Sequence, residues 1–264
     1  MENKLPAGWG NDEISRFLDV ARRNCLATFG RVKKTYHLLT SVDSEYRAVI
    51  ENLNQTKEVM LAAFLLRSHS CWLTAVGLAL SCQVYETYPI LRDCVEVSLY
   101  GWYIDRNREA LNAWAHREDD EKSKERAKNL FTIGRIFKEL RATYPSLHES
   151  VSHLYNRTID FGAHPNVLGF STNWAVKEGN GQVTFETRYQ NTEALPVILA
   201  LKTTAEVGIA SLSLFRWVWR ERYDLLGVTH RIDGLKRLLN TIAASATRLS
   251  GTETIDELDG LRIL

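Results

Sequence analysis

The sequence of 264 residues predicts a mainly all-α protein: a bundle of six to eight helices with a small inserted β-hairpin near residues 170–190. Three observations predict this class. Apolar residues recur at spacings of three and four over most of the chain, which is the helical period. Residues 166–191 differ, because TNWAVKEGNGQVTFETRY has β-type residues on both sides of Gly-Asn-Gly. With 45% hydrophobic and 25% charged residues, the composition suits one globular domain over residues 1–264.

The N-terminal region predicts two long helices and a shorter one between them. Asn11 is the expected cap of the first, whose apolar stripe should face the core. A second helical phase begins near Ser44, and residues 52–55 form a predicted turn. Residues 56–86 are apolar nearly all round, as in a helix surrounded by others. The stripe of the first helix consists of Ile14, Leu18, Ala21, Cys25, Phe29, Val32, Tyr36 and Leu39.

Prolines help to divide the middle of the chain. Pro89 suits the first turn of a helix that continues through residues 90–114. The charged run 116–128 should be solvated and should begin the next helix, which Pro145 ends. Ser146 is the expected cap of a helix that extends to about Ala163, since the following residue precedes a proline and disfavours helical backbone.

The C-terminal region predicts helices over residues 192–223 and 229–250, followed by a frayed tail at 251–264. Two apolar stretches, 71–85 and 196–219, are interpreted as core helices rather than membrane spans. The first is too short, and the second contains Lys202 and Glu206. Four separated cysteines and an N-terminus without a secretory pattern favour a cytoplasmic location.

Charge and motifs exclude several function classes. There are 33 basic and 32 acidic residues, so no overall field attracts nucleic acid or an anionic membrane. The chain has no phosphate loop, dinucleotide fingerprint, paired-cysteine zinc motif, H-E-x-x-H, Glu-x-x-His or G-x-S-x-G. We therefore expect no nucleotide cofactor, no bound metal and no other cofactor.

Two groups of polar residues are candidate sites. Arg92, Glu96 and Tyr100 are spaced by four and share one helix face, which predicts either a structural ion pair, the interpretation we favour, or a polar pocket between helices. The second group is Arg157, Asp160 and His164. His164 would act as a general acid or base, oriented by Asp160, while Arg157 stabilises an anionic transition state. The favoured alternative is that His164 only terminates a helix.

An aromatic pair near the C-terminus also has two interpretations. Trp217 and Trp219, with Arg216, Arg220 and Arg222 around them, would form a stacking platform for single-stranded nucleic acid. The favoured interpretation is a core helix that emerges into a basic end.

The helix with Arg-x-x-x-Glu and the later Tyr and His-Pro elements resemble a family of uncharacterised bacterial helical proteins, grouped as a domain of unknown function. The resemblance covers roughly residues 60–170. That family is similar in outline to the HEPN superfamily, many of whose members are metal-independent RNases of toxin and antiphage systems that use Arg-x(4–6)-His across a dimer interface. Here Arg31 with His37, Arg141 with His148, and Arg157 with His164 all have such a spacing. The residues that match the first family are Arg92, Glu96, Tyr155 and His164, with Thr158 and Asp160 where a serine is usual.

Two functions follow as expectations. The favoured one is a binding or interaction protein of bacterial stress or defence, with a polar interhelical site of Arg92, Glu96, Tyr100 and Tyr155, joined by His164. The alternative is a metal-independent endoribonuclease that cleaves RNA with Arg157 and His164. The resemblance also implies a homodimer.

Overall fold

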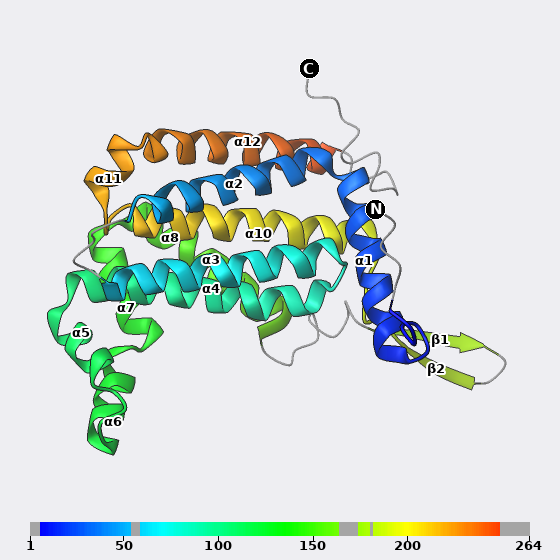
Figure 1. Ribbon diagram of the computed structural model, residues 1–264, viewed down its shortest axis with the longest axis horizontal. Coiled ribbons are helices and arrows are strands. Elements are labelled where there is room, and N and C mark those ends of the chain that lie inside the picture. The colour runs from blue at the N-terminus through cyan, green and yellow to red at the C-terminus, as the bar shows by residue number, and fades with distance from the viewer. Residues whose placement is uncertain (1–5, 54–58, 164–173, 180–181, 249–264) are drawn as a thin grey trace.

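The computed structural model describes residues 6–53, 59–163, 174–179 and 182–248. Within them the chain is mainly helical, as predicted, and the long helices lie side by side (Figure 1). The described residues form eleven α-helices, more than the expected six to eight, because several predicted helices are divided. The elements are α1 (Glu13–Arg31), α2 (Lys33–Glu51), α3 (Val59–Leu80), α4 (Val84–Arg106), α5 (Arg108–Ala115), α6 (Glu121–Leu130), α7 (Ile133–Thr143), α8 (Pro145–Thr158), the π-helical turn η1 (Ile159–Ala163), β1 (Trp174–Gly179), β2 (Gln182–Thr187), α10 (Ala194–Phe215), α11 (Arg220–Leu225) and α12 (Val228–Arg248).

Helix α10 is the centre of the bundle. It contacts α2, α3, α4, α8 and α12, and most of its residues from Val197 to Phe215 are buried. The closest approach is at Gly208, where an added Cβ would lie 2.4 Å from Nε1 of Trp72 and 2.7 Å from Cγ1 of Val42. The same Trp72 Nε1 donates a hydrogen bond of 2.9 Å to the Thr204 carbonyl. Because Gly208 has no side chain, the Trp72 indole can reach the α10 backbone.

Two predicted helices are interrupted where the side-chain pattern gives no warning. The helix expected from Ile14 to Leu39 breaks at Val32, whose φ of −112° and ψ of 48° leave the helical region. The helix expected over residues 56–86 ends at Leu80, because Cys82 adopts a left-handed φ of 66°. Apolar periodicity continues across both breaks, which is why the sequence did not reveal them.

The predicted orientation of the first helix is wrong for α1. Ile14, Leu18 and Phe29 belong to the stripe expected to face the core, yet they are 74%, 46% and 45% exposed. The part of the stripe on α2 is buried, as Leu39 shows. Because the predicted helix breaks at Val32, the two halves of its apolar stripe face different directions.

The predicted starts of three helices, α1, α8 and α4, are also wrong. Asp12 rather than Asn11 caps α1, since its Oδ1 accepts from the Ser15 amide at 2.8 Å. Helix α8 starts with Pro145 in its first turn, so Ser146 is not the cap. Proline is favoured there because its missing N–H has no helical acceptor.

Helix α4 begins at Val84, so Pro89 lies inside it rather than in its first turn. Proline cannot donate to the carbonyl four residues earlier, which is that of Tyr85. This carbonyl lies 2.7 Å from the position that a Cβ on Gly162 would occupy, so η1 packs against α4 with no room for a side chain. The proline and the glycine therefore meet at one helix contact.

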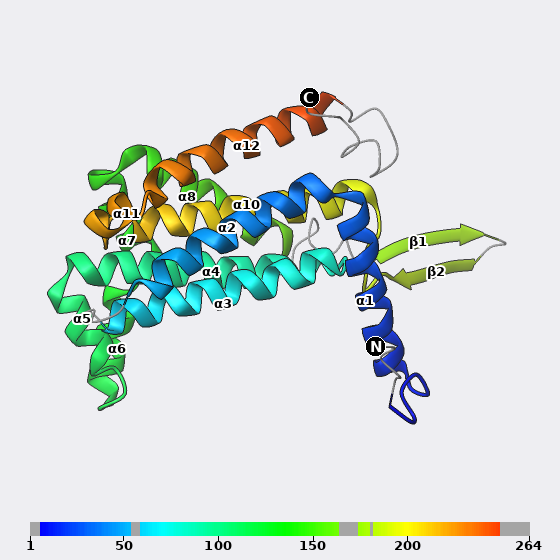
Figure 2. The same ribbon diagram turned by 45° about the horizontal axis from the view of Figure 1, so that its top comes forward.

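The hairpin is confirmed. Strands β1 and β2 pair antiparallel, with Trp174 opposite Thr187 and Gly179 opposite Gln182. They project beyond α1, at the end of the bundle away from α5 and α6 (Figure 2). The predicted frayed tail 251–264 and the start of the excursion, residues 166–173, lie outside the described residues.

Helices α3 and α10 are long and apolar enough to cross a membrane by length and composition alone. The core helix of a soluble bundle meets the same criterion. In α10, 78% of the apolar window is buried inside the protein, compared with 44% in α3. The described packing therefore accounts for the apolar character of α10 without a bilayer.

Replacing Gly208 should test the central contact. Gly208→Ala places a Cβ against Trp72 and Val42, and overpacking of this kind is expected to lower the free energy of unfolding by about 1–3 kcal/mol. The measurement is urea unfolding followed by tryptophan fluorescence. Gly77→Ala is the matched control, because Gly77 is in helix α3 with nothing within 4 Å of its added Cβ. The control should gain up to about 1 kcal/mol, and equal stability of the two variants would contradict the packing argument.

Candidate binding site

Two residues of the first predicted polar group form a cluster with Tyr155 between α4 and α8. We call it the α4–α8 cluster: Arg92, Glu96 and Tyr155. Arg92 Nε donates to Glu96 Oε1 at 2.8 Å, and Arg92 Nη2 donates to the Tyr155 hydroxyl at 3.1 Å. That hydroxyl in turn donates to Glu96 Oε1 at 3.1 Å. Each polar partner is thus engaged by the other two.

The α4–α8 cluster is partly buried, and its pKa values reflect this. Burial raises the pKa of Tyr155, and the nearby Glu96 carboxylate raises it further. Burial lowers the pKa of Arg92, but the hydrogen bond and charge of Glu96 outweigh it and give a net rise. The guanidinium and the phenol therefore keep their protons, which suits a structural link between helices better than proton transfer.

Tyr100 does not join this cluster. Its hydroxyl donates instead to the Phe131 carbonyl at 3.2 Å. Tyr100 and Glu96 do share a smaller cavity of about 360 Å³ between α3, α4 and α5, together with Arg67, Asp93 and Trp114. The spacing placed Tyr100 on the correct face, but the helix packing directs its hydroxyl elsewhere.

The second predicted group is only partly described. His164 lies outside the described residues. Asp160 is exposed on η1. Arg157 lies between α8 and α10, where its Nη1 donates to Glu206 Oε2 and, at 3.2 Å, to Thr203 Oγ1. Its Nη2 donates to His153 Nε2 at 2.9 Å. The guanidinium is therefore bound on two sides by this chain's own residues.

The sequence analysis missed the partners of Arg157. Glu206 also accepts from Lys202 Nζ at 2.7 Å, so two cations share one carboxylate. His153 with Arg157, and Lys202 with Glu206, are each four residues apart on a helix. That spacing is a usable signal for pairs within one helix. The sequence contains no such signal for the contact between α8 and α10, because it joins residues far apart in the chain.

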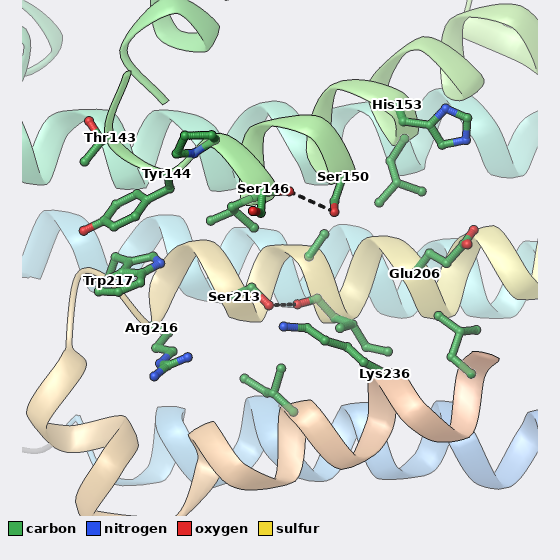
Figure 3. Close-up of a pocket in the computed structure, with 17 residues that line it drawn as sticks. Thr143, Tyr144, Ser146, Ser150, His153, Glu206, Ser213, Arg216, Trp217 and Lys236 are labelled. Carbon is green, nitrogen blue, oxygen red and sulfur yellow. Dashed lines mark hydrogen bonds between the residues drawn. The ribbon is translucent and has the colours of Figure 1, made fainter. Parts of the chain in front are cut away.

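Two of these residues, His153 and Glu206, form one end of a pocket of about 660 Å³ between α8, α10 and α12, the α8–α10–α12 pocket. Figure 3 shows His153 and Glu206 at one end and Tyr144, Arg216 and Trp217 at the other, with Lys236 reaching across from α12. Its middle is mostly apolar, with serine hydroxyls along it. The other lining residues include Leu147, Leu154, Ile209, Ala210, Ile232 and Leu239, with Ser146, Ser150 and Ser213.

Aromatic rings and arginines build the far end of the pocket. Trp217 stacks on Tyr144 with ring centroids 4.1 Å apart. The guanidinium carbons of Arg216 and Arg220 lie 5.4 and 5.6 Å from the centre of the Trp217 ring. Trp219 is not part of this surface, because it is buried and stacks on Phe215. The aromatic platform with both tryptophans is therefore wrong, and only Trp217 borders the pocket.

The two ends of the pocket differ in charge balance. At one end, Glu206 is matched by Arg157 and Lys202. At the other, Arg216 has no carboxylate partner among the described residues, and its Nε is buried without a hydrogen-bond partner there. Lys236 pairs with Asp233 at 3.3 Å, where both side chains are about half exposed. The Arg216 end thus has surplus positive charge and an unused buried donor.

Within the described ranges, no group of three or more His, Cys, Asp or Glu side chains is placed to hold a metal ion. Comparisons with protein-family models, with curated proteins and with solved structures found no match to this chain. The function therefore has to be inferred from the chemistry of the site itself.

Removal of Glu96 should show how the α4–α8 cluster stabilises the fold. Glu96→Ala takes away the carboxylate that Arg92 and Tyr155 share and should lower the free energy of unfolding by about 1–3 kcal/mol. Tyr155→Phe keeps the ion pair and should cost about 1 kcal/mol or less. Chemical denaturation of both variants is the measurement. A larger loss in Tyr155→Phe than in Glu96→Ala would contradict the assignment of Glu96 as the shared acceptor.

Proposed function

We propose that this protein binds a small amphipathic organic anion in the α8–α10–α12 pocket. The observation that carries the proposal is Arg216, a cation with an unused buried donor, at one end of a largely apolar pocket. The binding interpretation of the sequence is kept, but its site moves from the α4–α8 cluster to the other side of α8.

The size and lining of the pocket suit a small molecule. Binding sites for such ligands typically enclose about 300–1,000 Å³, with mainly apolar walls and a few polar groups that fix orientation. This pocket has about 660 Å³, and the groups at its two ends differ in charge balance (Figure 3). Apolar contact with Leu154, Ile209 and Ile232 would favour a hydrophobic body in the middle.

The charge of the ligand follows from the Arg216 end. Arg216 lines the pocket and has no carboxylate partner among the described residues, so a carboxylate, sulfonate or phosphate on the ligand would supply the missing negative charge. Lys236 supplies a second cation on the opposite wall. At the other end, Arg157 and Lys202 already neutralise Glu206, so that carboxylate offers little repulsion.

The endoribonuclease alternative is less well supported. It needs Arg157 to face a phosphate, yet Glu206, Thr203 and His153 occupy its guanidinium. A carboxylate bound to the arginine offsets the charge that would stabilise an anionic transition state. Catalysis by Arg157 and His164 remains a prediction, as do the cytoplasmic location, the absence of a membrane partner and the role in bacterial stress or defence.

A matched pair of fluorescent probes tests the proposed ligand class. Anilinonaphthalene sulfonate and uncharged phenylnaphthylamine have similar aromatic bodies and differ in the anionic group. We expect one sulfonate probe to bind per chain, at least about tenfold more tightly than the neutral probe, because a hydrogen bond to a charged group contributes about 1.5–3 kcal/mol. Fluorescence titration gives both Kd values.

Variants locate the probe. Arg216→Gln should abolish the preference for the sulfonate, while Arg117→Gln, which alters an exposed arginine beside Trp114, should preserve it. Ala210→Phe should fill the pocket and weaken both probes. Melting temperatures identify any variant that loses its fold. Equal affinity for the two probes in the wild type, or an unchanged preference in folded Arg216→Gln, would refute the proposal.

The nuclease alternative has its own test. Purified protein is incubated with total RNA and tRNA in chelator, beside Arg157→Gln and His164→Ala. We expect no cleavage above that of the two variants, because Arg157 is held by Glu206. Cleavage by the wild type that is lost in both variants at unchanged melting temperature would establish the ribonuclease and leave the pocket as a separate matter.

A further inference from the structure

Helix α1 turns its apolar side to solvent. Four large apolar residues that we call the α1 stripe are exposed, and they recur along nearly the whole helix: Ile14, Leu18, Leu26 and Phe29 are 74%, 46%, 66% and 45% exposed. Figure 2 shows that α1 leaves the bundle at a steep angle and is free of other helices along much of its length. A continuous stripe of this kind is typical of a protein interface rather than of a monomer surface.

Uncharged polar residues of α1 bind the bundle. Thr28 is buried, and its Oγ1 lies 3.7 Å from Cys82 Sγ. Asn24 Nδ2 donates to the Ser81 carbonyl at 3.4 Å and to Gln190 Oε1 at 2.9 Å, and Gln190 Nε2 donates to the Phe17 carbonyl at 3.0 Å. These hydrogen bonds fix how α1 is turned about its axis. The exposure of the α1 stripe is therefore a consequence of specific contacts.

We infer that a second copy of this chain covers the α1 stripe, with the two α1 helices antiparallel across a two-fold axis. The charges of α1 are complementary only in this direction. Residues 12–21 contain three carboxylates and one arginine, whereas residues 22–31 contain three arginines and no carboxylate. An antiparallel pair places the acidic half of each helix beside the basic half of the other, and a parallel pair places like charges together.

The register predicts one reciprocal ion pair. Asp19 and Arg22 are three residues apart near the middle of the helix, with Arg22 within the α1 stripe and Asp19 at its edge. A two-fold axis through that middle brings Asp19 of each chain beside the partner's Arg22. Ile14 then packs near the partner's Phe29, and Leu18 near the partner's Leu26. Apolar contacts thus lie on both sides of the ion pair.

A membrane surface fits the α1 stripe less well than a second copy. Helices that lie on membranes keep a basic polar face toward lipid headgroups and water. The N-terminal half of α1 instead contains three carboxylates and one arginine, and Asp19 borders the exposed apolar side. The carboxylates of the N-terminal half would be repelled by anionic lipids.

Sedimentation velocity of the full chain tests this interface. The wild type should be a dimer at micromolar concentrations, and Leu18→Glu should raise the dimer Kd at least about tenfold, because it loses apolar burial twice per dimer. Leu225→Glu is the matched control: Leu225 is 88% exposed on α11, at the other end of the bundle, and its replacement should leave the dimer intact (Figure 1). Both replaced residues are exposed, so the fold should persist, and circular dichroism checks this.

A charge exchange tests the register. Asp19→Arg alone and Arg22→Asp alone should each weaken the dimer, and the double variant should restore it. A monomeric wild type, a dimer unaffected by Leu18→Glu, or no recovery in the double variant would overturn the inference. Binding of the monomeric wild type to vesicles containing phosphatidylserine would overturn it in favour of a membrane surface. Because neither Asp19 nor Arg22 lines the α8–α10–α12 pocket, the probe titrations above can fail or succeed independently.

Discussion

Helix α10 can be surrounded on all sides only because Trp72 reaches its backbone. The indole lies where a side chain at position 208 would be, and its Nε1 hydrogen-bonds the Thr204 carbonyl. This contact sets how closely α3 approaches α10, and α2 joins at the same place through Val42. The remaining side of α10 faces α8 and α12. The residues on that side that line the pocket are Glu206, Ile209, Ala210 and Ser213. The pocket is thus built on a helix whose other faces are fixed by the core.

Buried polar groups give the core further direction. Ser68 lies between the Tyr46 hydroxyl at 3.2 Å and Ser98 Oγ at 2.9 Å, which links α2, α3 and α4. Satisfied polar networks of this kind favour one arrangement of helices over other apolar packings. The cysteine thiols are also polar groups that pack in or beside the core. Burial raises the pKa of all four thiols, to about 12 for Cys71, so they behave as packing residues rather than nucleophiles.

Helix α8 separates two polar regions with different characters. Tyr155 faces α4 and completes a cluster in which every polar group has a protein partner. Arg157 faces α10, and its partners His153 and Glu206 border a pocket. At the far end of that pocket, Arg216 retains an unused donor. The α1 stripe lies at the opposite end of the bundle from α11, so a dimer formed there leaves the pocket accessible (Figure 1).

The sequence by itself determined the helical class, the hairpin around Gly179 and the pairing of Arg92 with Glu96. These depend on period, turn residues and a spacing of four, which act over short distances along the chain. The tertiary structure alone decided that Tyr100 turns to Phe131 and that Arg157 meets Glu206 from another helix. It also decided that α1 binds the bundle through uncharged polar residues. Contacts between residues far apart in the chain depend on helix breaks such as Cys82 and on close approaches such as Gly208, and neither leaves a periodic signal in the sequence.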